Sequence, residues 1–134
     1  MNNKKNKIAA IYTKDFSTYK EKNKTLEIQS KICIQEAKQR GYEISRIYTD
    51  NENEQTEFLQ MLKDMKNQKF EVLIIAEFSR ISRKNRYLSE FFKQFEDSDI
   101  NLISITQQIN TAIPIGRLMF NLIGTFIESK ESIL

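Results

Sequence analysis

The chain has 134 residues, enough for one domain with a substantial core, and its 40% hydrophobic and 29% charged residues are ordinary for a globular protein. Its net charge of +3 permits contact with nucleic acid but does not by itself argue for it. The absence of histidine and the single Cys33 exclude zinc chemistry, a Ser-His-Asp triad and a disulfide framework.

Apolar runs and helical periodicity alternate along the first half of the chain. Residues 8–12 form a short apolar run that predicts a strand, and the polar residues 13–24 after it predict a loop long enough to be functional. Residues 25–40 have one apolar helical face and end before Gly41, a common helix terminator. Further along we expect a strand over residues 44–48, an acidic loop over 50–56 and an amphipathic helix over 58–65.

The second half repeats this alternation. Residues 70–76 are a nearly continuous apolar run, which is typical of a parallel strand buried on both faces. A helix over residues 85–97, a strand over 100–105 and a last helix after Pro114 and Gly116 are expected to follow. The last helix has an apolar stripe that fits either a core or an interface, made of Ile115, Leu118, Met119, Leu122, Ile123, Phe126 and Ile127.

Strands and helices thus alternate four times, which predicts an α/β fold. We expect a doubly wound, mostly parallel sheet of four to five strands with flanking helices. Ligands of such sheets bind at the carboxyl ends of the strands. Here those ends lead into the polar segments 14–24, 50–56 and 79–86, so we expect a single site at that edge, where strands one and three are neighbours.

The segment after the third predicted strand is the most informative part of the sequence. It carries Arg80, Arg83, Lys84 and Arg86 where we expect a helix to begin, although the positive end of a helix dipole repels cations. A helix N-terminus binds phosphate through its N–H groups, so a phosphodiester would offset that repulsion. The alternatives are pairing of the arginines with acids such as Glu77 and, for Lys84 and Arg86, a solvated basic face.

Other ligands have less support. The chain has three glycines and no glycine-rich loop, so neither the Walker phosphate-binding motif nor the dinucleotide-binding motif is present. Asp15 and Asp50 follow predicted strands and could bind a metal ion, which keeps an unrelated nucleotide- or metal-binding domain as a third hypothesis. We expect no cofactor and no metal.

Five segments together resemble the catalytic domain of the serine recombinases, the resolvase and invertase family. Residues 78–83 (Phe-Ser-Arg-Ile-Ser-Arg) resemble its Leu-Asp-Arg-Leu-Ser-Arg motif. Residues 110–121, with Asn-Thr, then Pro-Ile-Gly-Arg and Phe, are similar to the segment that opens its oligomerisation helix. The remaining likeness lies in residues 11–18 (a Tyr-x-Arg-x-Ser-Thr opening), 26–29 (a Ser-Leu-x-x-Gln helix start) and 41–50 (the second strand), and it covers nearly the whole chain in order.

The resemblance implies DNA cleavage by attack of a serine hydroxyl on a backbone phosphate, which leaves a 5′-phosphoserine link and a free 3′-hydroxyl. Motif by motif, it makes Ser17 the nucleophile, Arg80 and Arg83 the phosphate ligands, Lys14 an assisting cation and Gln29 a positioning residue. It also implies double-stranded DNA as partner and a homodimer or tetramer through residues 115–127. Further DNA contacts are expected from Lys84, Arg86 and Arg117.

The chain also departs from the family's pattern. Phe16 stands where the nucleophile is expected and Ser17 follows it, which a one-residue insertion in a loop accounts for. Three charged family residues, two arginines and one aspartate, are replaced by Lys14, Gln55 and Ser79. These departures favour an alternative, a catalytically degenerate resolvase-like domain that acts as a dimerisation or DNA-associated module or is a truncated remnant.

We expect residues 1–134 to form one catalytic domain whose last helix, from about residue 115, is truncated and whose DNA-binding domain is absent. Residues 1–7 lack the apolar stretch of a signal peptide, and no apolar run is long enough to span a membrane. We therefore expect a cytoplasmic protein.

Overall fold

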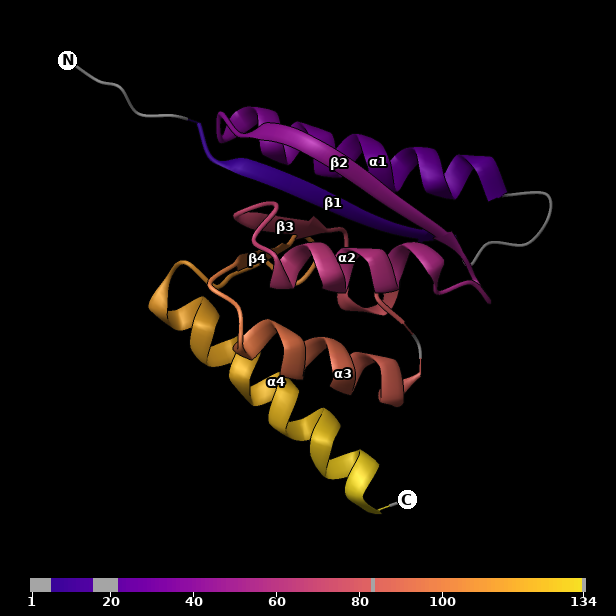
Figure 1. Ribbon diagram of the computed structural model, residues 1–134, viewed down its shortest axis with the longest axis vertical. Coiled ribbons are helices and arrows are strands. Elements are labelled where there is room, and N and C mark those ends of the chain that lie inside the picture. The colour runs from indigo at the N-terminus through magenta and orange to yellow at the C-terminus, as the bar shows by residue number, and fades with distance from the viewer. Residues whose placement is uncertain (1–5, 16–21, 83, 134) are drawn as a thin grey trace.

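The computed structural model of the chain describes residues 6–15, 22–82 and 84–133. Within them, five strands form one sheet in the order β2-β1-β3-β4-β5 (Figure 1). Strands β1 to β4 pair in parallel and β5 pairs antiparallel with β4, which confirms the predicted α/β fold. The strands are β1 (Ile8–Asp15), β2 (Glu43–Asn51), β3 (Val72–Ile75), β4 (Asn101–Ser104) and β5 (Ile109–Asn110).

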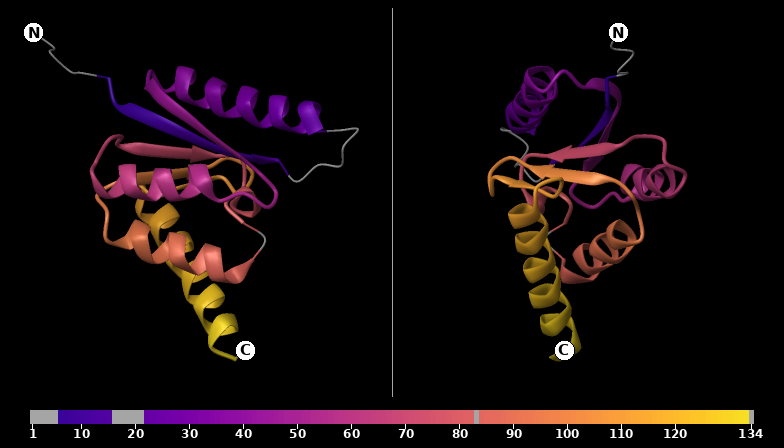
Figure 2. Two further views of the ribbon diagram at one scale, coloured as in Figure 1. Left: turned by 45° about the vertical axis from the view of Figure 1, so that its right-hand side comes forward. Right: turned by 90° about the vertical axis from the view of Figure 1, so that its left-hand side faces the viewer.

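Helices flank both faces of the sheet. Helix α1 covers one face, α2 and α3 cover the other, and α4 packs on α3 and β5 and then runs away from the sheet (Figures 1 and 2). None of the helices in the described residues has the length and apolar character needed to cross a membrane. The helical elements are α1 (Lys22–Gln39), α2 (Thr56–Lys66), the 3-10 turn η1 (Phe78–Arg80), α3 (Asn85–Glu96) and α4 (Pro114–Ile133).

The sheet separates two apolar cores, because successive residues of a strand point to opposite faces. Ile11 packs with Cys33 in the core beneath α1, whereas Tyr12 packs with Phe58 in the core beneath α2 and α3. Cys33 is fully buried as predicted, and this burial raises the pKa of its thiol to about 12. The thiol is therefore an inert part of the core.

A phenylalanine cluster ties η1 to α3 and α4. The rings of Phe92 and Phe120 stack with centroids 4.4 Å apart, and the ring of Phe78 lies 5.7 Å from the first and 6.2 Å from the second. At Gly124 the two helices approach so closely that an added Cβ would lie 2.8 Å from Phe92. The turn that carries Arg80 is thus anchored in the core by the residue two positions before it.

Two strands extend beyond their apolar patterns. β1 continues to Asp15 and α1 begins at Lys22, so the predicted loop over residues 13–24 was too long at both ends. β2 likewise runs to Asn51. The reason is pairing between polar residues, since Thr13 to Asp15 pair in register with Thr49 to Asn51.

Helix α4 begins at Pro114, close to the start that was predicted at about residue 115. Pro114 occupies its first position, where proline is favoured because no N–H is needed. Gly116 therefore lies inside the first turn of α4 rather than before it. A Cβ at this position would lie 2.0 Å from the carbonyl oxygen of Asn110, so the docking of α4 on β5 requires glycine here.

Candidate active site

The carboxyl ends of the central strands meet at one edge of the sheet, together with the first turns of α2 and α3 (right-hand side of Figure 1). β1 lies between β2 and β3, as expected for neighbouring strands one and three. Tyr12 pairs with Ile75 at the end of β3, and η1 packs against β1 just beyond that pair. The edge therefore brings Lys14 of β1 into the neighbourhood of the turn that carries Arg80.

Gln29 of α1 holds the end of β1 through both backbone groups of Lys14. Its side-chain Oε1 accepts a hydrogen bond from the Lys14 N–H at 3.2 Å, and its Nε2 donates to the Lys14 carbonyl at 2.9 Å. Gln29 is only 3% exposed, so it is a buried bridge between helix and strand. This bridge fixes β1 directly before residues 16–21, which contain the predicted nucleophile Ser17 and lie outside the described residues.

The Lys14 side chain is buried and reaches the loop before α2. It is 1% exposed, and its Nζ donates a hydrogen bond to the Glu54 carbonyl at 3.1 Å. Burial lowers the pKa of the ammonium group below its usual value; the positive charge of Lys84 acts in the same direction, and the Asp50 carboxylate opposes both. Lys84 at the start of α3 is therefore close enough to Lys14 to repel it.

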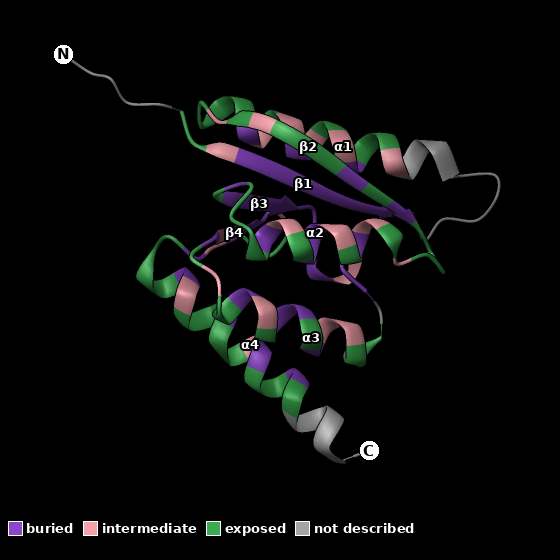
Figure 3. Cartoon of the chain, viewed as in Figure 1, coloured by how far each residue is buried: buried purple, intermediate pink, exposed green. Residues whose placement is uncertain are grey.

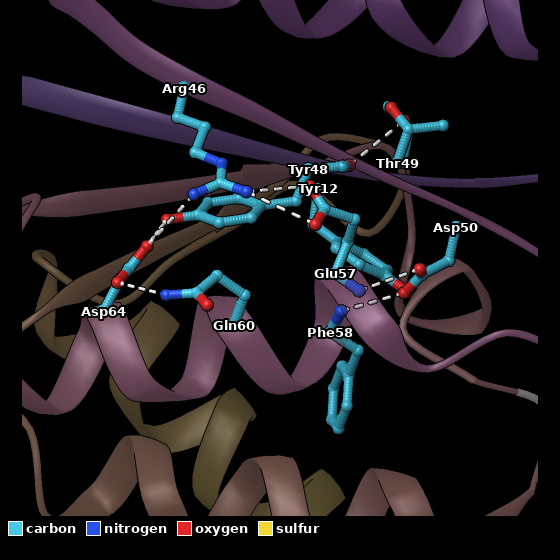
Figure 4. Close-up of polar contacts among 10 residues, drawn as sticks. Tyr12, Arg46, Tyr48, Thr49, Asp50, Glu57, Phe58, Gln60 and Asp64 are labelled. Atoms are coloured by element: carbon cyan, nitrogen blue, oxygen red, sulfur yellow. Dashed lines mark hydrogen bonds and ion pairs between the residues drawn. The ribbon is translucent and has the colours of Figure 1, made fainter.

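Asp50 of β2 caps helix α2. Its Oδ1 accepts a hydrogen bond from the Glu57 N–H at 2.9 Å, and its Oδ2 accepts from the Phe58 N–H at 2.8 Å and from the Tyr12 hydroxyl at 2.9 Å (Figure 4). Burial, together with the charge of Asp50, raises the pKa of Tyr12 well above its usual value, so the phenol stays protonated and donates. Both oxygens of Asp50 serve the fold, so this carboxylate is not available as the metal ligand weighed from the sequence.

Arg80 lies at the end of η1, directly after β3. Its Nε is 3.4 Å from Oε1 of Glu77, and the same oxygen accepts a hydrogen bond from the Ser79 hydroxyl at 2.6 Å. The pairing of Arg80 with Glu77 that the sequence left open is therefore present. Contact of Arg80 with a phosphate stays a prediction, and Arg83, its predicted partner, lies outside the described residues.

The prediction that one helix start carries all four cations is wrong. Residues 78–80 close a separate 3-10 turn, and Ser82 Oγ accepts a hydrogen bond from the Lys84 N–H at 3.0 Å before α3 begins at Asn85. Among the cations that the structure describes, Lys84, the N-cap residue, and Arg86, in the first turn, belong to the helix start, whereas Arg80 does not. Both are exposed, and the first turn of α3 contains no acid that would offset their repulsion by the helix dipole.

Tyr87 is a member of this edge that the sequence reasoning missed. Its hydroxyl accepts a hydrogen bond from Arg86 Nη2 at 3.0 Å, and its ring centroid lies 4.9 Å from the Arg86 guanidinium carbon and 6.0 Å from Lys84 Nζ. The only signal in the sequence is a tyrosine next to a basic cluster. Arg117 is not brought to this group, because its guanidinium lies 5.7 Å from the ring of Phe95 in the last turn of α3.

The family model "Resolvase, N terminal domain" matches residues 11–134, and the chain belongs to this family. The transposon Tn917 resolvase of Enterococcus faecalis is 31% identical over 62 residues, which are 46% of this chain and 34% of that protein. The DNA-invertase of Escherichia phage P1 is 28% identical over 64 residues, 48% of this chain and 34% of that protein. The aligned stretches thus span about a third of the length of these relatives.

Solved structures show the same fold. The N-terminal catalytic domain of TP901-1 integrase superimposes with a TM-score of 0.76 at 22% identity, over 95% of this chain and 98% of that one. Membership of the resolvase family overturns the third hypothesis, an unrelated nucleotide- or metal-binding domain.

Proposed function

We propose that this chain is the catalytic domain of a serine recombinase and acts in site-specific DNA recombination. The observation that carries the proposal is the positive charge at the carboxyl edge of the sheet, in a member of the resolvase family. Lys14, Arg80, Lys84 and Arg86 come to this edge from three elements and the segment before α3, and Lys84 and Arg86 are exposed at a helix start without an acid. A DNA phosphate would offset this charge.

In the proposed reaction the hydroxyl of Ser17 attacks the phosphorus of a DNA phosphodiester. A bond forms between Ser17 Oγ and the 5′-phosphate, the P–O3′ bond breaks, and the leaving 3′ oxygen gains a proton that balances the one lost by serine. Arg80 and Arg83 stabilise the charge on the reacting phosphate, which arginine can contact through two nitrogens at once. Lys14 adds positive charge, and Gln29 holds the strand that leads to Ser17.

The test is an adduct assay with a nicked duplex that traps the covalent intermediate, read on a denaturing gel. We expect a protein–DNA adduct that disappears in Ser17→Ala and forms roughly a hundredfold more slowly in Arg80→Ala. Ser45→Ala, in the edge strand β2, is the matched control and should leave the adduct unchanged. An adduct that survives Ser17→Ala but is lost in Thr18→Ala would contradict Ser17 as the nucleophile.

A second candidate is a catalytically degenerate domain of the same family. Lys14 Nζ is tied to the Glu54 carbonyl, and Gln55 is neutral, with a buried Oε1 that has no hydrogen-bond partner in the described part of the chain. At the two positions where the family carries arginine, this chain thus has one hydrogen-bonded cation, Lys14, and one neutral residue, Gln55. Absence of the adduct in the wild-type chain and its appearance in Gln55→Arg would favour this candidate.

In either case we propose that α4 joins two or more copies of this chain. Its inner face is buried through Phe120 and Ile127, whereas its outer face is apolar yet exposed (green on α4 in Figure 3). The exposed side chains, 39–62% accessible, are Ile115, Leu118, Met119, Leu122 and Phe126. This exposed apolar stripe supports the proposal, because such patches are typical of protein–protein interfaces.

Sedimentation of the chain tests this association. We expect a homodimer or tetramer that dissociates in Leu122→Asp, because a carboxylate in the interface would lose its hydration. Asn121→Asp, on the exposed neighbouring position, adds the same charge and should leave the oligomer intact. A chain that stays monomeric at high concentration would overturn the proposed role of this face.

A further inference from the structure

Glu77 contacts Arg80 through both its backbone carbonyl and its side-chain carboxylate. It is the extended residue between β3 and η1, and its carbonyl accepts a hydrogen bond from the Arg80 N–H at 3.0 Å. Its Oε1 lies 3.4 Å from Arg80 Nε and also accepts from the Ser79 hydroxyl at 2.6 Å. One carboxylate oxygen therefore contacts both residues that follow Phe78.

The environment makes this contact more than a surface ion pair. The Arg80 side chain is 19% exposed and that of Glu77 is 31% exposed, so solvent screens the pair only in part. The turn between them is anchored through Phe78, which is buried in the phenylalanine cluster. Glu77 Oε1 contacts Arg80 Nε as an ion pair and not as a hydrogen bond. Because Nε joins the planar guanidinium to its stem, the attraction of a carboxylate there favours one direction of the fork.

We propose that Glu77 is a positioning residue that orients Arg80 toward the reacting phosphate, a role that rests on the proposed function above. The motif that residues 78–83 resemble has an aspartate where this chain has Ser79. Here the carboxylate stands two residues earlier, and the Ser79 hydroxyl donates to it. This chain thus has an acid in contact with Arg80, two residues before the position of the family's aspartate.

A carboxylate beside a phosphate-binding arginine can act in two opposite ways. If it orients the guanidinium, its removal misaligns the fork and slows the reaction. If it only neutralises Arg80, its removal raises the positive charge available to the phosphate and speeds the reaction. Glu77→Gln, which keeps shape and removes charge, distinguishes these outcomes, and the double variant Glu77→Gln with Ser79→Asp tests whether a carboxylate two residues later restores the role.

The first readout is the order parameter of the Arg80 Nε–Hε bond, measured by NMR on the full chain without DNA. We expect it to fall in Glu77→Gln, to recover in the double variant and to stay unchanged in Glu96→Gln, a control that removes an exposed charge from α3. An order parameter that is unaffected by Glu77→Gln would overturn the proposal. This readout needs no catalysis, so it separates failure of the positioning role from failure of the proposed reaction.

The second readout is the rate of adduct formation at saturating DNA, alongside the dissociation constant for the same duplex. We expect Glu77→Gln to slow the adduct roughly tenfold to a hundredfold with little change in affinity, and the double variant to recover most of the rate. Faster adduct formation in Glu77→Gln, or no recovery in a double variant that restores the order parameter, would overturn the proposal.

Discussion

The two regions that flank the candidate site handle charge in opposite ways. In the β2–α2 region the charged side chains of four residues have partners within the protein, namely Arg46, Asp50, Glu57 and Asp64 (Figure 4). Arg46 Nη2 lies 3.0 Å from Glu57 Oε1 and its Nη1 lies 3.7 Å from Asp64 Oδ2, while the Tyr48 hydroxyl donates to Asp64 at 2.6 Å. Asp50 completes the region as the cap of α2.

In the η1–α3 region, which comprises Glu77, Arg80, Lys84, Arg86 and Tyr87, one acid contacts Arg80 and the other two cations are exposed. Lys84 and Arg86 share an aromatic ring and face the unfavourable end of a helix dipole. From this difference we infer that the paired charges of the β2–α2 region stabilise the fold, whereas the exposed cations of the η1–α3 region are available to a ligand. Substitutions in the β2–α2 region should therefore lower stability, whereas those in the η1–α3 region should lower DNA binding.

The largest expected effect is that of Asp50→Ala. It removes the cap of α2, worth about 1–2 kcal/mol, and leaves the buried Tyr12 hydroxyl without its acceptor, which costs about 1–3 kcal/mol. We expect urea unfolding to show a loss of about 3 kcal/mol in the free energy of unfolding, with unchanged DNA affinity of the folded fraction. Asp99→Ala, which removes an exposed acid, is the control. A loss of stability in Asp50→Ala no greater than the loss in Asp99→Ala would contradict the stabilising role of the β2–α2 charges.

The double variant Lys84→Gln with Arg86→Gln is expected to have an intermediate effect, on DNA binding alone. The salt dependence of binding, the slope of log K against log salt, should become shallower by about two for two lost phosphate contacts. Thermal stability should stay the same or rise slightly, because repulsion by the helix dipole is removed. Lys63→Gln with Lys66→Gln, at the end of α2, removes the same charge and should leave the slope unchanged.

The smallest expected effect is that of Tyr48→Phe, and it depends on pH. Burial would raise the pKa of Asp64, but hydrogen bonds from Tyr48 and Gln60, together with the positive charges of Arg46 and Lys69, outweigh it, so this pKa lies below its usual value of 3.8. The stabilisation is therefore present above pH 3.8 and is lost as the pH falls through the lowered folded-state pKa. We expect Tyr48→Phe to lower the free energy of unfolding by about 1 kcal/mol at neutral pH and by less in acid. Urea unfolding measured from neutral pH to below pH 3.8 checks this expectation. A loss of stability that does not change with pH would contradict it.

The sequence predicted the fold because apolar runs and stripes are local patterns. The continuous run that became β3 and the phenylalanines of α3 needed no knowledge of distant residues. The ends of β1 and β2 were missed because Lys14 and Asp50 are polar, and their place in strands depends on pairing between segments 36 residues apart. The resemblance made Gln29 a positioning residue, but it did not give its partner, because the bridge joins a helix to the backbone of a strand.

In the candidate site, too, local patterns could be predicted and contacts between distant residues could not. Arg80, Lys84 and Arg86 were found from charge and motif, both of which are local. The break between η1 and α3 was not, because no proline or glycine marks it and the buried Phe78 and Ile81 hold it in place. The contact of Glu77 with Arg80 has a local signal, an acid three residues before an arginine, and the sequence therefore left it open.

The most direct test of the phosphate-binding edge is an NMR titration of the chain with a short duplex of arbitrary sequence. Backbone amide shifts should concentrate at residues 77–82 and 84–87, decrease with added salt, and leave the β2–α2 residues 46–48 and 57–64 unchanged. Shifts that gather instead around Arg46 and Asp64, with the η1–α3 region unchanged, would contradict the assignment of this edge to DNA.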